Sequence, residues 1–510
     1  MSTDVIIVGG GPNGLMLACE LALAGVRPLV LETLPAPSNE PKANGLLGQV
    51  VQLIDRRGLY ERLTGQPGPP VPNSTYFMFA AMPLDLSMLD ASPLYTALAP
   101  QPHIVRVFSA RAGELGVDVR WGHEVVDLRP SEESVTLIVD GPDGRYELTS
   151  SYVVGADGGH SAVRKKAGIG FPGITRDRVT ARAVNATVPA EWIDPATSAL
   201  DVPGFGRVMP FLPHRTDHGG FTFAPFPDRP TLLATNEWDQ APVEGPMTLD
   251  EMAASIRRVL GVGVPLGPPP GDGPHVLRRT SDQNVRIAEE FRRGRVFLLG
   301  DAAHVGTGGG SGLNLGMQDA ANLAWKLAVV LQGHAAPELL DTYESERRGA
   351  ADRMVMFGQA QAALIAPGEE VTALRDLIGE LLRSRDVVAH LAGLTAGSDH
   401  RYDMELDSPH ATVGRFAPEL SLVDGGRLSD LARDARPMLV DLTADAAASK
   451  LGWSDRIQVV AGRPAGPSPA TVFLVRPDGY VAWATSSAQL DGAELAAVRA
   501  AAERWFGPSV

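Results

Sequence analysis

The sequence predicts an α/β protein in which one nucleotide-binding domain is assembled from two segments roughly 290 residues apart. Near the N-terminus, the pattern Gly9-x-Gly11-x-x-Gly14 follows a short run of β-branched residues. Far downstream, a second apolar run ends in Gly300-Asp301. Buried parallel strands are continuous apolar runs, and the turns after them line ligand crevices. We therefore expect the chain to leave one ligand site and to return to it.

The N-terminal segment has the order strand, glycine turn, helix, strand and acid. Val5–Val8 is the first strand, helical spacing follows Gly14, and a second apolar run ends in Glu32. Such a turn binds a pyrophosphate because its glycines allow close approach and the helix N-terminus offers N–H donors. Glu32 would accept hydrogen bonds from a ribose and repel a 2′-phosphate, which favours FAD or NAD over NADP. The residues expected to bind the cofactor here are Gly9, Gly11, Pro12, Asn13 and Gly14.

Composition limits the class of protein. A chain of 510 residues is too long for one core, so two or three domains are expected. A net charge of −15 argues against nucleic acid or an anionic membrane as a partner, and no apolar run reaches transmembrane length. Cys19 is the only cysteine, which excludes an intrachain disulfide and fits a cytoplasmic location. No metal site is expected.

The middle of the chain contains further strands. Arg120–Leu128 and Ser134–Val139 are predicted strands, and a later apolar strand delivers Asp157 and Gly158 at its end. Residues at the carboxyl ends of such strands often line a ligand crevice. The alternative is that Asp157 or Ser161 simply caps the helix that follows.

The downstream segment repeats this arrangement. The strand Gly294–Leu299 leads into Gly300 and Asp301, and a glycine-dense loop then precedes a helix predicted at about 314–331. Asp301 is placed to bind the hydroxyls of a ribityl or ribose chain. A helix N-terminus stabilises negative charge, such as that of a reduced flavin at N1 and the C2 carbonyl. The alternative, a capped helix behind a flexible loop, explains Asp301 but not the number of glycines. The residues expected to face the flavin are Gly312, Leu313 and Asn314.

Together, these motifs resemble the single-component FAD-dependent aromatic hydroxylases of the para-hydroxybenzoate hydroxylase fold. The resemblance spans about residues 3–355 and includes Arg57-Gly58-Leu59 and the pattern from Asp157-Gly158 to Arg164. It implies a Rossmann-like FAD-binding domain, residues 1–170 with 276–400 returning to it, interleaved with a β-sheet substrate domain, residues 171–275. In such enzymes NADPH reduces FAD, O2 forms a flavin C4a-hydroperoxide, and the distal oxygen passes to an electron-rich ring. Only one dinucleotide fingerprint is present, so NADPH or NADH would bind transiently.

The resemblance also assigns roles to individual residues. Gln101 and Arg106 fall where the family contacts the FAD phosphate and ribityl region, and Asp157-Gly158 is the motif linked to both FAD and NADPH. Lys42 replaces the arginine that usually touches the pyrophosphate, which keeps the charge but loses the bidentate contact. The loop 305–312 lacks the prolines of its relatives, so chemistry other than ring hydroxylation stays open. Thr307 in this loop is a weak candidate for a catalytic hydrogen-bond donor.

No catalytic base is evident. A base that deprotonates a phenol would help its hydroxylation, and His214 and His304 are candidates by position alone. Four strands are predicted for the substrate sheet, at 179–188, 206–211, 220–225 and 231–237. Aromatic residues on this sheet suit either a flat apolar substrate or ordinary packing, and these residues are Phe211, Phe221, Phe223 and Trp238.

Residues 401–510 resemble the thioredoxin-like C-terminal domain of larger family members that act on polyketides and bulky phenols. The predicted elements are a strand at Pro437–Leu442, a hairpin over Thr471–Trp483 and a helix over Asp491–Phe506. Without a Cys-x-x-Cys, dithiol chemistry is excluded, and packing or dimerisation is the expected role, which leaves a homodimer open. We predict an FAD-dependent, NAD(P)H-consuming monooxygenase that inserts one oxygen atom from O2 into a bulky, polyketide-like aromatic substrate. Baeyer–Villiger or epoxidising oxygenation, and a flavoprotein reductase or dehydrogenase without oxygenase activity, are the alternatives.

Overall fold

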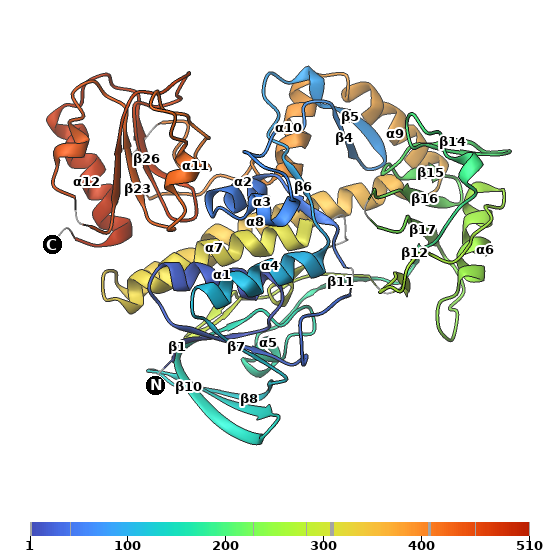
Figure 1. Ribbon diagram of the computed structural model, residues 1–510, viewed down its shortest axis with the longest axis horizontal. Coiled ribbons are helices and arrows are strands. Elements are labelled where there is room, and N and C mark those ends of the chain that lie inside the picture. Colours follow the sequence, from blue (N-terminus) through green and yellow to red (C-terminus); the bar gives the residue numbers. More distant parts are fainter. Residues whose placement is uncertain are drawn as a thin grey trace.

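An eight-stranded sheet carries the N-terminal glycine turn after β1 and the downstream Gly300-Asp301 turn after β21, with the single strand β10 between them (Figure 1). The computed structural model describes residues 3–40, 42–227, 229–281, 283–306, 311–405, 410–453 and 455–508. The sheet order is β20-β21-β10-β1-β2-β7, with β9 paired to β10 and β8 to β9. The strands are β1 Thr3–Val8, β2 Pro28–Glu32, β7 Asp118–Trp121, β8 Glu124–Pro130, β9 Val135–Gly141, β10 Gly144–Gly155, β20 Arg292–Arg293 and β21 Val296–Leu298.

Strand β1 is the centre of the parallel part of this sheet. It pairs in parallel with β2 on one side and with the second half of β10 on the other, and β21 follows β10. Val5, Ile6 and Ile7 are fully buried, as the continuous apolar run predicts. The carboxyl ends of β1, β10 and β21 therefore lie at one edge of the sheet, where all three glycine-containing turns emerge.

Helices cover one face of this sheet (Figure 1). The helices α1 Pro12–Leu23, α4 Gln101–Glu114 and α7 Ser311–Leu331 lie side by side there, and α8 Asp341–Ile365 crosses beyond α7. Helix α7 begins at Ser311, three residues before its predicted start, and ends at the predicted Leu331. The remaining helices of this region are α2 Gln49–Arg56, α3 Tyr60–Thr64 and α5 Ala162–Lys166.

One predicted strand of this sheet is wrong. The segment Arg120–Leu128 forms two strands, β7 and β8, instead of one. Gly122 separates them with φ +77°, a left-handed conformation that a strand residue does not adopt. The chain therefore turns between the two strands, and β8 pairs with β9 instead of extending β7.

A second sheet of five strands lies at the far end of the molecule, in the order β15-β16-β17-β12-β18. Its strands are β12 Val179–Asn185, β15 His214–Thr216, β16 Gly219–Ala224, β17 Leu232–Trp238 and β18 Leu277–Thr280, and α6 Leu249–Leu260 covers one face. The predicted strand at 206–211 is wrong as part of this sheet. Only Gly206–Val208 is a strand, β14, and it pairs with β13 Leu200–Val202 outside the sheet. Phe211 has φ +61°, which ends any strand there.

Short strands and helices connect the two sheets. A hairpin of β4 Tyr76–Phe79 and β5 Met82–Asp85 packs against α10 Arg385–Ala396, and α9 Glu369–Leu381 continues from α8. The remaining strands are β3 Gly45–Leu47, β6 Thr96–Leu98, β11 Gly173–Arg176, β19 Gln283–Ile287 and β22 His304–Val305. Short 3-10 turns lie at 86–88, 190–192, 300–302, 337–340 and 448–450. No helix in the described ranges is long and apolar enough to span a membrane.

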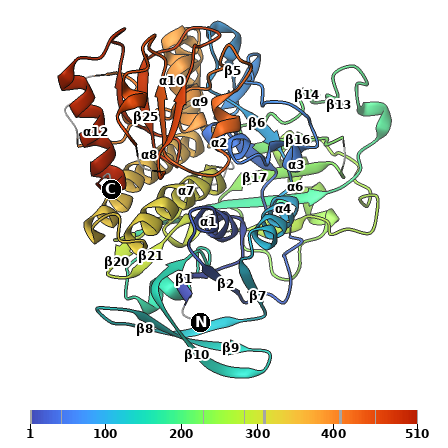
Figure 2. The same cartoon turned by 60° about the vertical axis from the view of Figure 1, so that its left-hand side comes forward.

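The C-terminal residues form a four-stranded sheet in the order β24-β23-β25-β26. The elements are α11 Leu428–Leu431, β23 Met438–Asp441, β24 Gln458–Ala461, β25 Val472–Val475, β26 Val481–Thr485 and α12 Gly492–Phe506. Helix α12 confirms the predicted terminal helix. Asp491 and Glu494 form a capping box that fixes its start. Helix α11 lies beside α2, so this unit packs against the first domain (Figure 2).

Candidate cofactor and substrate site

The N-terminal glycine turn leaves space at one position and none at the others. A Cβ atom on Gly9 would lie 2.3 Å from the carbonyl oxygen of Ala156, and one on Gly14 would lie 2.1 Å from the carbonyl oxygen of Gly9. A Cβ atom on Gly11 would meet no atom within 4 Å. Gly9 and Gly14 therefore let strand and helix approach closely, whereas Gly11 opens the turn to a ligand.

The N-terminus of α1 is left uncapped. Gly11 is its N-cap and provides no side-chain acceptor, and Pro12 occupies the first turn, where its missing N–H costs nothing. The first N–H groups of a helix have no partner within the helix. The Oδ1 atom of Asn13 is also buried without a hydrogen-bond partner. This end of α1 therefore offers the N–H donors that a bound phosphate requires, and Asn13 Oδ1 is an additional acceptor for a donor group of a ligand.

The downstream segment meets this turn directly. Gly300 has φ +57°, and a Cβ atom there would lie 2.4 Å from Nδ2 of Asn13. A Cβ atom on Gly316, in α7, would lie 2.1 Å from the same nitrogen. The side chain of Asn13 thus lies between two glycines that come from the other half of the domain. The two segments expected to share one ligand do lie together.

Asp301 follows Gly300 and presents an exposed carboxylate that makes no hydrogen bond to the described residues. Crowding by surrounding protein atoms raises the pKa of Asp301, and His304 and Lys42 act in the opposite direction. Gly312 lies close by, since a Cβ atom there would be 3.6 Å from Oδ1 of Asp301. Lys42 itself pairs with Glu40 at 3.0 Å on the surface. An acceptor without a partner beside the glycine turn suits the hydroxyls of a nucleotide.

Glu32 is bound to the protein backbone at the end of β2. Its Oε2 accepts from the N–H of Gly10 at 2.7 Å, and its Oε1 accepts from the N–H of Leu34 at 2.9 Å. Carboxylate oxygens accept more than one hydrogen bond, so Glu32 retains capacity for a ribose hydroxyl. Its first role in the structure is to fix the glycine turn.

Asp157 caps a helix, which was the alternative to a ligand contact. It accepts from the N–H groups of Ala162 at 2.7 Å and Val163 at 3.1 Å, and from the hydroxyl of Ser161. The pKa of Asp157 is raised above its usual value, because burial outweighs the opposing effect of these hydrogen bonds. The next residue, Gly158, has φ +80°, so it turns the chain before α5. The carboxylate of Asp157 is therefore largely committed to the protein.

The other expected cofactor residues surround the same edge. Gln101 begins α4 and donates its backbone N–H to the carbonyl of Ala43, and Arg106 is exposed one turn further along α4. Leu313 and Asn314 lie in the first turn of α7. Asn314 Oδ1 accepts from the N–H of Leu47 at 2.8 Å, which fastens this turn to β3. Thr307 lies outside the described residues.

A buried charge network beneath Gly300 was not predicted from the sequence. Asp319 of α7 accepts from the Gly300 N–H at 3.1 Å, from Nε2 of His304 at 2.6 Å and from Nε of Arg347 at 2.7 Å. Burial alone would raise the pKa of Asp319, but His304 and Arg347 hold it below its usual value. The signal was present in the sequence, because Asp319 and Lys326 are the two charged residues in a largely apolar helical segment. His304 is fully buried in this network, so a structural role fits it better than a base.

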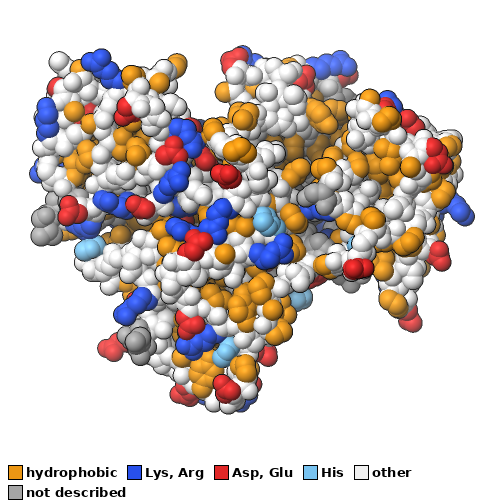
Figure 3. Space-filling model, in the orientation of Figure 1, with side chains coloured by type: hydrophobic (Ala, Val, Ile, Leu, Met, Phe, Trp, Pro, Cys, Tyr) orange, Lys and Arg blue, Asp and Glu red, His pale blue; other side chains and the backbone are white. Residues whose placement is uncertain are grey.

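The substrate sheet has two different faces. Phe221 and Phe223 are fully buried against α6, so they serve ordinary packing. Because residues alternate along each strand, the opposite face carries both small and larger side chains. The larger ones include Leu232, Asn236 and Trp238. The small ones are Gly220, Thr222, Ala224, Ala181, Ala183 and Ala234. Figure 3 shows hydrophobic side chains gathered in a hollow between this sheet and the β4–β5 hairpin.

Helix α8 connects this open face to the cofactor edge. A Cβ atom on Gly306, just after the Asp301 turn, would lie 2.5 Å from Sδ of Met354, and one on Gly220 would lie 3.8 Å from Ile365. Eleven residues separate Met354 from Ile365, which corresponds to about 16 Å of helix. Helix α8 therefore runs from the cofactor edge to the substrate sheet and contacts both.

His214 lies at the edge of the substrate sheet, in β15. Its Nε2 accepts from the backbone N–H of Met209 at 2.7 Å, and burial lowers its pKa. This nitrogen is therefore occupied, which does not favour His214 as a base. Trp238 ends β17, and Phe211 contacts Phe226 with ring centroids 5.2 Å apart.

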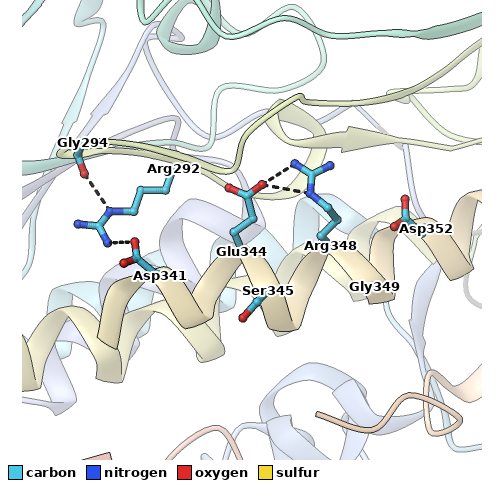
Figure 4. Close-up of a pocket in the computed structure, with 8 residues that line it drawn as sticks. All are labelled: Arg292, Gly294, Asp341, Glu344, Ser345, Arg348, Gly349 and Asp352. Atoms are coloured by element: carbon cyan, nitrogen blue, oxygen red, sulfur yellow. Dashed lines mark hydrogen bonds and ion pairs between the residues drawn. The ribbon is translucent and has the colours of Figure 1, made fainter. Parts of the chain in front are cut away.

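A larger surface hollow lies elsewhere, on the outer side of α8 (Figure 4). It measures about 730 Å³, and its charged side chains pair with one another, Arg292 with Asp341 at 2.6 Å and Arg348 with Glu344 at 2.7 Å. Nothing in it faces the glycine turns. It is therefore not the cofactor site.

Fold and site together define a dinucleotide-binding α/β enzyme with a separate substrate sheet. The residues fit FAD: Gly11 leaves room, the N-terminus of α1 is uncapped, and among the described residues Asn13 Oδ1 and the Asp301 carboxylate have no hydrogen-bond partner. Comparison with known proteins agrees. Residues 2–358 match the family described as FAD binding domain, and residues 410–509 match the family described as aromatic-ring hydroxylase, C-terminal.

Full-length relatives carry the same signature. The chain is 39% identical to the 12-dehydrotetracycline 5-monooxygenase/anhydrotetracycline 6-monooxygenase of Streptomyces rimosus, over 100% of this chain and 99% of that protein. The solved structure of OxyS anhydrotetracycline hydroxylase from Streptomyces rimosus is 38% identical, with a TM-score of 0.84 and 100% coverage of both chains. CabE, an aromatic hydroxylase from angucycline biosynthesis, is 33% identical with a TM-score of 0.83 and 100% coverage of both chains. The chain belongs to the family of FAD-dependent aromatic hydroxylases, and it is an FAD-dependent monooxygenase.

Proposed function

We propose that the protein hydroxylates a polycyclic, polyketide-derived aromatic compound, with NADPH or NADH as reductant. The names of its similar proteins refer to tetracycline-type and angucycline compounds. The observation that carries the proposal is the face of the five-stranded sheet turned away from α6, where Thr222, Ala234 and Ala183 form a row of small side chains across three paired strands. Flat apolar ligands are held mainly by such surfaces, with few polar contacts for orientation.

The cofactor residues have distinct proposed tasks. Gly9, Gly11 and Gly14, with the α1 N-terminus, would hold the pyrophosphate, and Glu32 the adenosine ribose. Asp301 would bind the ribityl chain. The first turn of α7, at Leu313 and Asn314, would face the flavin ring and stabilise negative charge on it. Lys42, Gln101 and Arg106 would complete the phosphate contacts, and Asp157-Gly158 would shape the turn beside them.

The protein positions the substrate and excludes water from the reaction. Bound FAD supplies the redox chemistry that activates O2. The apolar hollow excludes water, and the sheet holds the ring system flat against its small side chains. No described residue is assigned as a base, since His304 is buried in the Asp319 network and His214 Nε2 is occupied.

The C-terminal unit has a thioredoxin-like strand order in this proposal. Numbered along the chain, its strands lie in the order 2-1-3-4, with the first two parallel and the others antiparallel. Cys19 lies outside it, so the unit carries no dithiol. Homodimerisation and a cytoplasmic location stay predictions.

Substrate-stimulated NAD(P)H oxidation is the test. We expect a tetracyclic or angucyclic phenol to accelerate NADPH or NADH oxidation with matching O2 uptake, and labelled O2 to yield a product with one labelled oxygen on the ring. A labelled lactone or epoxide would replace hydroxylation by Baeyer–Villiger or epoxidising chemistry. Bound flavin that no polycyclic phenol stimulates would favour a flavoprotein without oxygenase activity.

A further inference from the structure

We infer that Tyr402 is a positioning residue through which the C-terminal unit holds the cofactor turn at Gly300-Asp301. The inference rests on the proposed placement of FAD at this turn. It assigns to the C-terminal unit a task in cofactor binding, beyond packing or dimerisation. A chain of buried contacts runs from one unit to the other.

The first part of this chain belongs to the C-terminal unit. The backbone N–H of Tyr402 donates to the carbonyl of Gly414 at 2.8 Å. Its ring stacks on that of Tyr480, with centroids 4.1 Å apart and planes inclined by 25°. The guanidinium of Arg476 lies 5.3 Å from the same ring. Backbone, stack and cation therefore fix both the place and the tilt of Tyr402.

The second part crosses into the FAD-binding domain. Nη1 of Arg347, in α8, donates to the hydroxyl of Tyr402 at 2.7 Å, and Nε of Arg347 donates to Asp319 at 2.7 Å. The remaining nitrogen, Nη2, donates to the carbonyl of Leu315 and to Gln318. The Arg347 guanidinium is fully buried, so each of its acceptors matters.

The third part reaches the cofactor turn. Asp319 accepts from the backbone N–H of Gly300 and from His304, which lie on either side of Asp301. A carboxylate held from one side by Arg347 keeps its oxygens aimed at these two donors. A continuous path of buried hydrogen bonds therefore runs from Tyr402 to the two residues that flank Asp301.

The variant Tyr402→Phe tests whether this path of hydrogen bonds affects the cofactor turn. It removes only the hydroxyl that accepts from Arg347 and keeps the ring in its stack. Tyr480→Phe is the matched control, because Tyr480 is in the same stack and equally buried, but its hydroxyl donates to Gln49 and not to Arg347. Both variants lose one buried hydrogen bond, so both are expected to melt at a lower temperature.

The two variants should differ in FAD affinity. We expect Tyr402→Phe to raise the Kd for FAD by roughly five-fold or more, the range of ordinary coupling between sites, and Tyr480→Phe to leave it within two-fold. Coupling is reciprocal, so FAD should slow hydrogen exchange at the Tyr402 amide in the wild-type chain. Equal Kd values for the two variants, or an exchange rate indifferent to FAD, would overturn the inference. Wild-type chain that binds no FAD, or Asp301→Ala that binds it normally, would instead overturn the proposed cofactor placement.

Discussion

The side chain of Asn13 occupies the space that a side chain on Gly316 would need. Asn13 comes from the first turn of α1, and Gly316 lies about 300 residues later in α7. A Cβ atom on Gly316 would lie 2.1 Å from Nδ2 of Asn13 and 2.9 Å from Cα of Gly300. The two halves of the domain therefore pack together where Asn13 meets Gly300 and Gly316. This contact forms the cofactor edge.

Gly316→Ala should disturb that closure. The added methyl group meets the Gly300 backbone as well as a flexible amide, so relaxation of Asn13 alone cannot accommodate it. We expect a loss of about 1–3 kcal/mol in the free energy of unfolding, with weaker retention of FAD. Denaturant unfolding and flavin content after gel filtration measure both. Gly379→Ala in α9 is the control, since its Cβ atom meets nothing within 4 Å, and it should be neutral or stabilising. Identical behaviour of the two variants would contradict the crowding.

Asp301→Ala should weaken FAD binding more than Asp157→Ala. Asp301 has no hydrogen-bond partner in the described chain, whereas Asp157 binds two backbone N–H groups of α5. The loss of Asp157 should therefore lower the free energy of unfolding by about 1 kcal/mol, because a helix cap is lost. Its effect on FAD affinity should be small. FAD titration and thermal unfolding of both variants separate the effects. Equal FAD affinities would count against the role of Asp301.

Acid should weaken the contact between the C-terminal unit and α8 through Glu346. Its carboxylate is buried between Lys326 at 2.8 Å and Arg476 at 2.7 Å. Burial alone would raise the pKa of Glu346, but these two cations lower it to about 2. A carboxyl group with a lowered folded pKa stabilises the protein above its unfolded pKa, near 4.3, and loses that contribution as the pH falls toward the folded value.

The stability difference between wild type and Glu346→Gln should therefore shrink as the pH falls from 6 to 3. The contribution at stake is about 3 kcal/mol. Denaturant unfolding at each pH measures it, and Glu370→Gln, on the exposed face of α9, should show no such trend. A difference that stays constant with pH would contradict the lowered pKa.

Removal of all residues beyond 400 should harm folding before it harms hydride transfer. Arg56 of α2 donates to the carbonyls of Ala417 and Gly479, and its neighbour Arg57 donates to those of Ala432 and Pro477. The truncation removes these acceptors, so that Arg57 keeps only Glu20, and it exposes Trp325 and Leu339, which pack in the core of the C-terminal unit. Exposure of this apolar surface is destabilising. Solubility and melting temperature of the truncated chain test this. A soluble, stable truncated protein that fails to accept hydride from NADPH would contradict it.

Much of the framework was predictable from local patterns. The first strand, helix α1 and the capped terminal helix follow from apolar periodicity, glycines and capping residues within a few positions of one another. Local pattern failed at Arg120–Leu128, where Gly122 takes a left-handed conformation inside the predicted strand. It failed again at residues 206–211, where tertiary pairing places β14 outside the sheet.

The site was predictable in part. The glycine turns and Asp301 follow from motifs, and the structure does bring them to one edge. The buried partners of the site were not predictable, because Asp319, Arg347 and Tyr402 come from three separate segments and meet only after packing. Glu32 shows the same limit: its backbone bond to Gly10 depends on how β2 lies beside the turn.

The most direct test of the central claim is the visible absorption spectrum of the purified full-length chain, before and after incubation with FAD and removal of free flavin. If the two glycine segments form one FAD site, the folded chain should retain FAD in a stoichiometric amount and show an oxidised flavin spectrum. A correctly folded, colourless chain that retains no FAD after incubation would contradict the account.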